Sequence, residues 1–213
     1  MGTCATVMHE ISLARQFISN SGRAGDEVSL EIALRGALSR ARNECPTLPE
    51  AIVPDGRYVE HLASLARRDE GFEVTECHAG DLLVVVGCLD HVGAALALLD
   101  KEIGRIVPLA ARHLARDRTA LDELGQLLRV RLLVCDGRDK PRIADYSGRG
   151  PLGAWIRVAA VRLALNQRER AHGRAERMSE EASPELPFVG QSPELRAMRE
   201  RYAPELARAI ENA

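Results

Sequence analysis

Aromatic side chains are scarce in this chain of 213 residues, at 3% of the total. Runs of Val, Ile and Thr are short and tight-turn dipeptides are few, which argues against a β-sandwich or a β-barrel. Stretches rich in Ala, Leu and Arg take their place, and these residues favour helices. Hydrophobic residues make up 46% and charged residues 28% of the sequence, enough to build a folded core. We therefore expect an all-α protein, a helical bundle.

Cysteine is also scarce, and the five cysteines at positions 4, 45, 77, 88 and 135 form no dense pattern. An odd number of scattered cysteines predicts free thiols in a reducing compartment rather than a disulfide framework. The longest apolar stretch, residues 82–99, contains Asp90 and His91 and falls short of the roughly 20 apolar residues of a bilayer span. The N-terminus does not resemble a signal peptide. We expect a cytoplasmic protein with no membrane partner.

The net charge of −2 conceals a strong asymmetry along the chain. Residues 1–104 carry a net charge of −7, residues 105–177 of +8, and residues 178–213 of −3. The basic block is almost entirely arginine, whose guanidinium group pairs with phosphate in a bidentate manner. This pattern is typical of a polyanion-binding element, although exposed helix arginines are often only solvated.

Apolar residues recur at helical spacing in several segments. The predicted helices cover residues 10–17, 28–42, 58–68, 82–106, 118–134, 152–170 and 193–210. Thr119 is the expected N-cap of the helix over 118–134, and Pro151 opens the helix over 152–170. Prolines at 46, 49 and 54 predict an extended or turning segment, and residues 136–150 a loop with a short element at 143–146.

The helix over 152–170 carries the candidate nucleic-acid contacts. At about 100° per residue, one face is predicted to pack and the opposite face to meet a partner. The packing face comprises Leu152, Trp155, Ile156, Ala159 and Leu163, and the opposite face Arg157, Val161, Ala164 and Arg168. Arg162 and Asn166 lie at the edge, and Arg149 lies in a flexible glycine loop before the helix. Trp155 is more typical of a core residue than of a base-stacking one.

Two segments of the basic block carry a family resemblance. The string RIADYSGRGPLGAWIRVAAVRLALNQRER resembles regions 2.3 and 2.4 of bacterial sigma-70-type factors of the extracytoplasmic-function class. The upstream string LDELGQLLRVRLLV is similar to region 2.2 of the same family, and both look closest to its myxobacterial-type branch. The resemblance covers residues 80–177, with the order and spacing of both motifs preserved.

The resemblance implies roles for named residues. Region 2.2 docks on the clamp helices of the β′ subunit of core RNA polymerase, which implies Asp122, Glu123, Gln126 and Arg129 as the docking face. Regions 2.3 and 2.4 recognise and melt the promoter minus ten element, by capturing unpaired bases and backbone phosphates. The DNA-binding residues so implied are Arg149, Trp155, Arg157, Arg162, Asn166 and Arg168. Arg162 and Asn166 depart from the Asn and Asp that are frequent at these positions in the family.

The resemblance also implies a domain organisation. We expect an acidic helical N-terminal extension over 1–75, a sigma region 2-like domain over 76–177, a linker over 178–193, and a C-terminal helix over 194–213. The last segment resembles the lead-in to the family's second domain, whose helix-turn-helix reads the minus thirty-five element. Too few residues follow for that domain, so we expect region 2 only, in a genuine region-2-only protein, a truncated gene product or a fragment of a longer protein.

Other chemistries find little support. Cys77-His78 and Cys88-Leu89-Asp90-His91 lack the close Cys and His pairs of zinc sites, and buried thiols with surface histidines are the plainer interpretation. GRGPLG lacks the Lys-Ser/Thr of a phosphate loop. We therefore expect no metal, no cofactor and no enzymatic activity.

The sequence predicts a transcription initiation factor that binds core RNA polymerase and the promoter minus ten element, with an anti-sigma factor as a further partner. The alternative is a non-catalytic interaction protein that binds polymerase or an anti-sigma partner without directing promoter opening.

Overall fold

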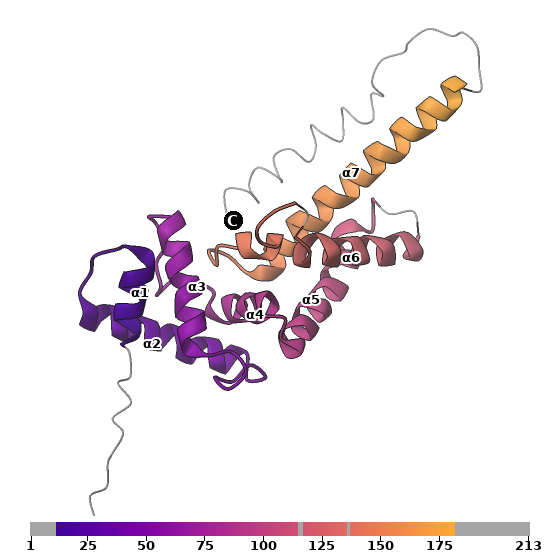
Figure 1. Ribbon diagram of the computed structural model, residues 1–213. Coiled ribbons are helices and arrows are strands. Elements are labelled where there is room, and N and C mark those ends of the chain that lie inside the picture. The colour runs from indigo at the N-terminus through magenta and orange to yellow at the C-terminus, as the bar shows by residue number, and fades with distance from the viewer. Residues whose placement is uncertain (1–11, 115–116, 136, 182–213) are drawn as a thin grey trace, which may run out of the picture. The chain divides into compact units, whose positions relative to one another are not determined.

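A computed structural model of the chain describes residues 12–114, 117–135 and 137–181. Its regular elements in these ranges are all helical, which confirms the all-α class. They are α1 (Leu13–Ser21), α2 (Glu27–Glu44), α3 (Asp55–Arg68), α4 (Ala79–Leu89), α5 (Gly93–Ala111), α6 (Arg118–Leu133), the short 3-10 helix η1 (Arg142–Asp145) and α7 (Leu152–Glu181) (Figure 1).

The helices form two compact units that share α5. The first unit contains the chain as far as Leu99 together with Ile143–Arg149, and the second contains Asp100–Arg142 and the chain from Gly150 onward. The first unit therefore includes residues on both sides of the expected boundary at residue 75. The expected C-terminal helix over 194–213 lies outside the described residues, as does the linker from residue 182.

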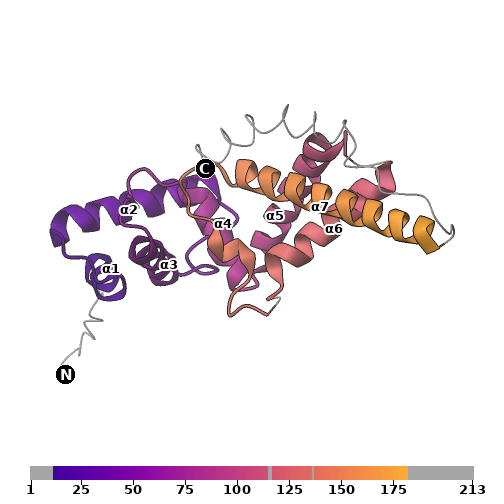
Figure 2. The same cartoon turned by 90° about the horizontal axis from the view of Figure 1, so that it is seen from above.

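In the first unit, α1 packs against α2 and α3, and α4 in turn contacts α2 and α3 (Figure 2). Their apolar side chains share a core to which α2 gives Leu34 and Leu38 and α3 gives Leu62. Tyr58 of α3 is fully buried, and its hydroxyl donates to the carbonyl of Ala79 at 3.0 Å. Burial raises the pKa of Tyr58 far above its ordinary value, so the phenol stays neutral and holds the start of α4.

Glu31 of α2 joins the first two helices. Its carboxylate accepts hydrogen bonds from the backbone amide of Ala14 at 2.8 Å and from the hydroxyl of Ser12 at 3.0 Å. The pKa of Glu31 is lower than its ordinary value. The hydrogen bond from the Ala14 amide lowers it most, and the Ser12 hydroxyl and Arg35 lower it further. Glu31 therefore satisfies a donor in the first turn of α1, where no backbone partner exists.

Several helix ends differ from the sequence-based expectations. The first helix ends at Ser21 rather than residue 17, because the left-handed residue that closes it is Gly22, at φ 72°. Helix α6 is capped by Asp117, not Thr119, and the Asp117 carboxylate accepts from the amide of Ala120 at 2.8 Å. Helix α7 continues to Glu181 instead of ending near residue 170, since residues 171–181 contain good helix formers and no proline.

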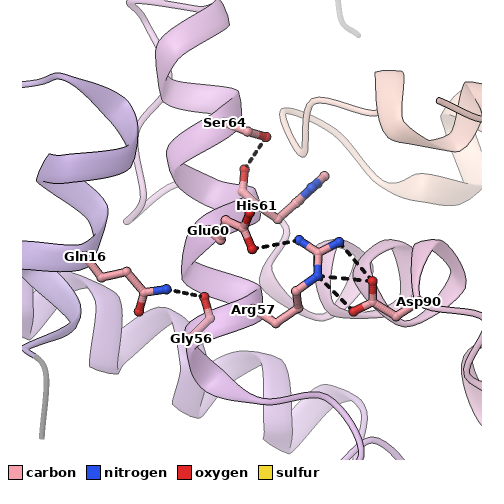
Figure 3. Close-up of polar contacts among 7 residues, drawn as sticks. All are labelled: Gln16, Gly56, Arg57, Glu60, His61, Ser64 and Asp90. Atoms are coloured by element: carbon pink, nitrogen blue, oxygen red, sulfur yellow. Dashed lines mark hydrogen bonds and ion pairs between the residues drawn. The ribbon is translucent and has the colours of Figure 1, made fainter. Parts of the chain in front are cut away.

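The single helix expected over 82–106 is wrong, because the chain breaks between α4 and α5. At the break His91 adopts a left-handed conformation with φ 56°, and the amide of Val92 donates to the carbonyl of Gly87 at 2.8 Å. Arg57 of α3 grips the Asp90 carboxylate, with its Nε donating to both oxygens at 3.1 Å and its Nη2 donating to Oδ1 at 2.9 Å (Figure 3). A bidentate guanidinium pair fixes the orientation of the carboxylate as well as its position.

The break between α4 and α5 also divides the longest apolar stretch of the chain into two shorter helices. Within the described ranges, no helix taken alone has the length and apolar character needed to cross a bilayer. Helices α4 and α5 reach that length and composition only together, and a bend of 118° separates them.

Candidate functional site

Helix α6 presents most of the residues predicted to dock on polymerase. Asp122, Glu123 and Gln126 are all exposed. The other side of the helix is buried against its own unit through Leu124, Gly125, Leu128 and Leu132. Asp122 and Glu123 lie beyond the first turn of α6, so the helix dipole, whose effect falls off within that turn, contributes little to their placement.

Arg129 differs from the other three residues of this set. It is half-buried and forms an ion pair with Asp100 of α5, through its Nε and the Oδ1 of the aspartate. Both residues belong to the second unit, so the pair ties α6 to α5. A guanidinium that is already paired with a carboxylate is a poorer candidate for docking than the three exposed polar residues.

Helix α7 packs on α6 in the second unit, as both views show (Figures 1 and 2). The packing face differs from the predicted one. The buried residues are Leu152, Ile156, Ala160 and Ala164, spaced by four, whereas Trp155, Ala159 and Leu163 are only half-buried. The assignment of Ala164 to the partner face was therefore wrong. Small alanines at this spacing let two helices approach closely.

The predicted DNA-binding residues of α7 occupy two separate stripes. Arg157 is exposed and Arg168 half-buried, and helical geometry places them on one stripe. Trp155, Arg162 and Asn166 share a second stripe, which lies about 150° around the helix from the first. Arg162 and Asn166 are exposed. The helix therefore brings each group together but does not bring the two groups onto one surface.

Arg149 belongs to the first unit, while α7 belongs to the second. Its guanidinium forms an ion pair with Asp69 at 2.5 Å, with both side chains substantially exposed. The glycine loop that carries it is attached to the start of α4 by one backbone hydrogen bond, in which the carbonyl of Gly148 accepts from the amide of His78 at 2.9 Å. Tyr146 in the same loop is buried, and burial raises the pKa of its hydroxyl.

One surface of α6 was missed by the sequence interpretation. Leu127, Val130 and Val134 are 42%, 56% and 52% exposed, and the spacing of three and four residues puts them on one face. Large exposed apolar groups that gather on one helix face are typical of an interaction site. The signal was present in the sequence, because α6 carries this second apolar stripe in addition to the buried one of Leu124, Leu128 and Leu132.

The cysteines and histidines do not form a metal centre in the described part of the chain. No group of three His, Cys, Asp or Glu side chains lies close enough together there to hold an ion. Cys45, Cys77, Cys88 and Cys135 are free thiols, as expected, and Cys4 lies outside the described residues. Cys77 and Cys88 are buried, and burial raises the pKa of Cys88 to about 12.

Comparison of the chain with protein-family models, with curated proteins and with solved structures finds no match. A functional conclusion therefore depends on the residues and geometry of the chain itself.

Proposed function

We propose that this chain is a transcription initiation factor that binds core RNA polymerase through α6 and promoter minus ten DNA through α7. The resemblance of both segments to sigma-70-type factors of the extracytoplasmic-function class supplies the two partners. The assignment includes no catalytic step, since each contact only binds and orients.

The observation that supports the proposal most directly is the pairing of the two motifs in one unit. Helices α6 and α7 pack on each other, and each keeps charged or polar side chains exposed. Asp122, Glu123 and Gln126 are exposed on α6, and Arg157 and Arg162 on α7. An acidic docking face beside a cationic helix is suited to a protein that must contact polymerase and nucleic acid at once.

Polymerase docking is tested by reversing one charge on α6. Glu123→Lys should weaken binding of the full chain to core RNA polymerase by about tenfold, because a charge-matched contact becomes repulsive. Glu50→Lys is the matched control, since Glu50 is an exposed glutamate of the first unit. Equal affinities of the two variants for polymerase would show that Glu123 of α6 is not part of the polymerase interface.

DNA binding is tested through its salt dependence. The double variant Arg157→Ala with Arg168→Ala should reduce the slope of log affinity against log salt by about 2, roughly one unit for each phosphate that an arginine no longer neutralises. Arg67→Ala, at an exposed arginine of α3, should leave the slope unchanged. An unchanged slope in the double variant would show that this stripe does not meet phosphate.

The alternative, an interaction protein that binds polymerase or an anti-sigma factor without opening a promoter, is favoured by two observations. The arginines of α7 lie on two stripes, and Arg149 is paired with Asp69. Permanganate footprinting of a promoter with core polymerase and the full chain separates the two functions. Reactive thymines at the minus ten element support the initiation factor, and polymerase binding without them supports the alternative.

A further inference from the structure

The turn that follows α3 holds the side chain of Arg149. Nη2 of Arg149 lies 2.5 Å from Oδ2 of Asp69, and both residues belong to the first unit. Gly71 leaves room for the guanidinium, since a Cβ added to Gly71 would lie 3.0 Å from Nη2 of Arg149. The guanidinium is therefore seated on this turn, residues 69–72, which we call the Asp69 turn.

The Asp69 turn has contacts that do not involve Arg149. Oδ1 of Asp69 accepts from the amide of Gly71 at 3.1 Å, and the carbonyl of Asp69 accepts from the amide of Phe72 at 3.0 Å. Arg23 donates to the carbonyls of Asp69 and Phe72, at 2.5 and 3.1 Å. These contacts keep the Asp69 carboxylate in place whether or not Arg149 is paired with it.

The segment that carries Arg149 has contacts of its own as well. Arg68 donates to the carbonyl of Ala144 at 3.2 Å, and the carbonyl of Gly148 accepts from the amide of His78 at 2.9 Å. The ion pair therefore joins two segments that are each held separately. Its opening requires movement of the Arg149 side chain and not of either backbone segment.

The charge next to this ion pair is negative. Glu70 adjoins Asp69 and is exposed, and Glu73 is exposed in the same segment. A phosphate group that reaches Arg149 must displace the Asp69 carboxylate, and it meets the field of Glu70, because charges are screened only over about 8 Å at physiological salt. The Asp69 turn therefore opposes the binding of a polyanion to Arg149.

We propose that Asp69 is an autoinhibitory residue, whose carboxylate binds the guanidinium of Arg149 in place of a nucleic-acid phosphate. Carboxylate and phosphate accept from the same N–H groups of arginine, so each excludes the other. The inhibition is small, about two- to fivefold in DNA affinity, since the two side chains are 50% and 35% exposed. It rests on the part of the function proposed above that assigns Arg149 to DNA, and it gives the acidic segment before residue 76 a role in that function.

Fluorescence anisotropy of a single-stranded DNA oligonucleotide with the full chain, without polymerase, tests this role. Asp69→Asn should bind about two- to fivefold more tightly than the unmodified chain, because the asparagine keeps an oxygen that can accept from Gly71 but has no charge. The slope of log affinity against log salt should steepen by about 0.7, the value for one phosphate of a single strand, because Arg149 then binds phosphate without releasing a carboxylate.

Glu70→Gln is the matched control, since it removes the same charge from the adjoining exposed residue. It should change DNA affinity by less than about twofold. In a chain that already carries Arg149→Ala, Asp69→Asn should give no larger gain than Glu70→Gln, because the guanidinium that it would release is missing. Circular dichroism should show the same helix content in all variants.

Three results would overturn the autoinhibitory role of Asp69. The first is a DNA affinity of Asp69→Asn that equals that of Glu70→Gln, and the second is a full gain that persists without Arg149. The third is weaker binding by Asp69→Asn, which would mean that Asp69 orients Arg149 for DNA instead of competing with it. Absence of single-stranded DNA binding in every variant would also overturn it.

Failure of the proposed function has a different readout. Permanganate footprinting with core polymerase reports promoter opening, which the anisotropy assay does not require. Tighter binding by Asp69→Asn without reactive thymines at the minus ten element would support the autoinhibitory contact and refute the initiation factor. Reactive thymines with no gain in Asp69→Asn would refute the contact and support the initiation factor.

Discussion

Replacement of Gly148 by Ala should destabilise the first unit for two reasons, an unfavourable backbone conformation and a steric overlap. The same replacement at Gly22 tests the first reason alone. Gly148 has φ +75°, and a Cβ added there would lie 2.6 Å from Cδ1 of Leu82. A side chain in the left-handed region costs about 1–2 kcal/mol. The overlap with Leu82, a fully buried residue, costs about a further 1–3 kcal/mol, because a close-packed core must shift to accept it. We expect a total loss of about 2–5 kcal/mol.

Gly22→Ala is the matched control for this experiment. Gly22 has almost the same φ, +72°, and lies in the same unit, but nothing is within 4 Å of a Cβ added there. It should lose only the conformational part, about 1–2 kcal/mol. Urea unfolding followed by far-ultraviolet circular dichroism measures both losses as shifts of the transition midpoint. Equal losses of stability in the two variants would refute the overlap argued between a Cβ at position 148 and Leu82. A loss of stability in Gly22→Ala but not in Gly148→Ala would refute both the overlap and the conformational cost.

Three further predictions concern single groups. The backbone amide at the start of α1 lowers the pKa of Glu31. The ionised carboxylate therefore stabilises the fold above its unfolded pKa near 4.5, and this stabilisation is lost as the pH falls through the folded value. Glu31→Gln should reduce the difference in urea midpoint between pH 7 and pH 3. Cys135 is exposed and should react with a thiol reagent in the native protein, whereas Cys88, whose pKa burial raises to about 12, should react only in denaturant, as peptide mass spectrometry would show. Arg57→Met should cost about 1 kcal/mol in urea unfolding, because the ion pair with Asp90 is only partly shielded from water; a value near zero would mean that the break after α4 holds without it.

The break between α4 and α5 illustrates what sequence periodicity leaves out. Residues 82–106 contain one long apolar pattern, and a run of this kind predicts a single helix. Arg57 lies 33 residues before Asp90 in the chain and binds its carboxylate at the break. A contact at that separation has no signature in local spacing. Helix existence was predictable from composition, whereas periodicity alone did not place the bend that this contact accompanies.

The candidate site was predictable in part for the same reason. The exposed residues Asp122, Glu123 and Gln126 follow from the helical period of α6. In α7, by contrast, many residues around the helix are small and apolar, so periodicity alone does not select which of them pack. The structure selects the line through Ala160 and Ala164, and the arginines then fall on two stripes.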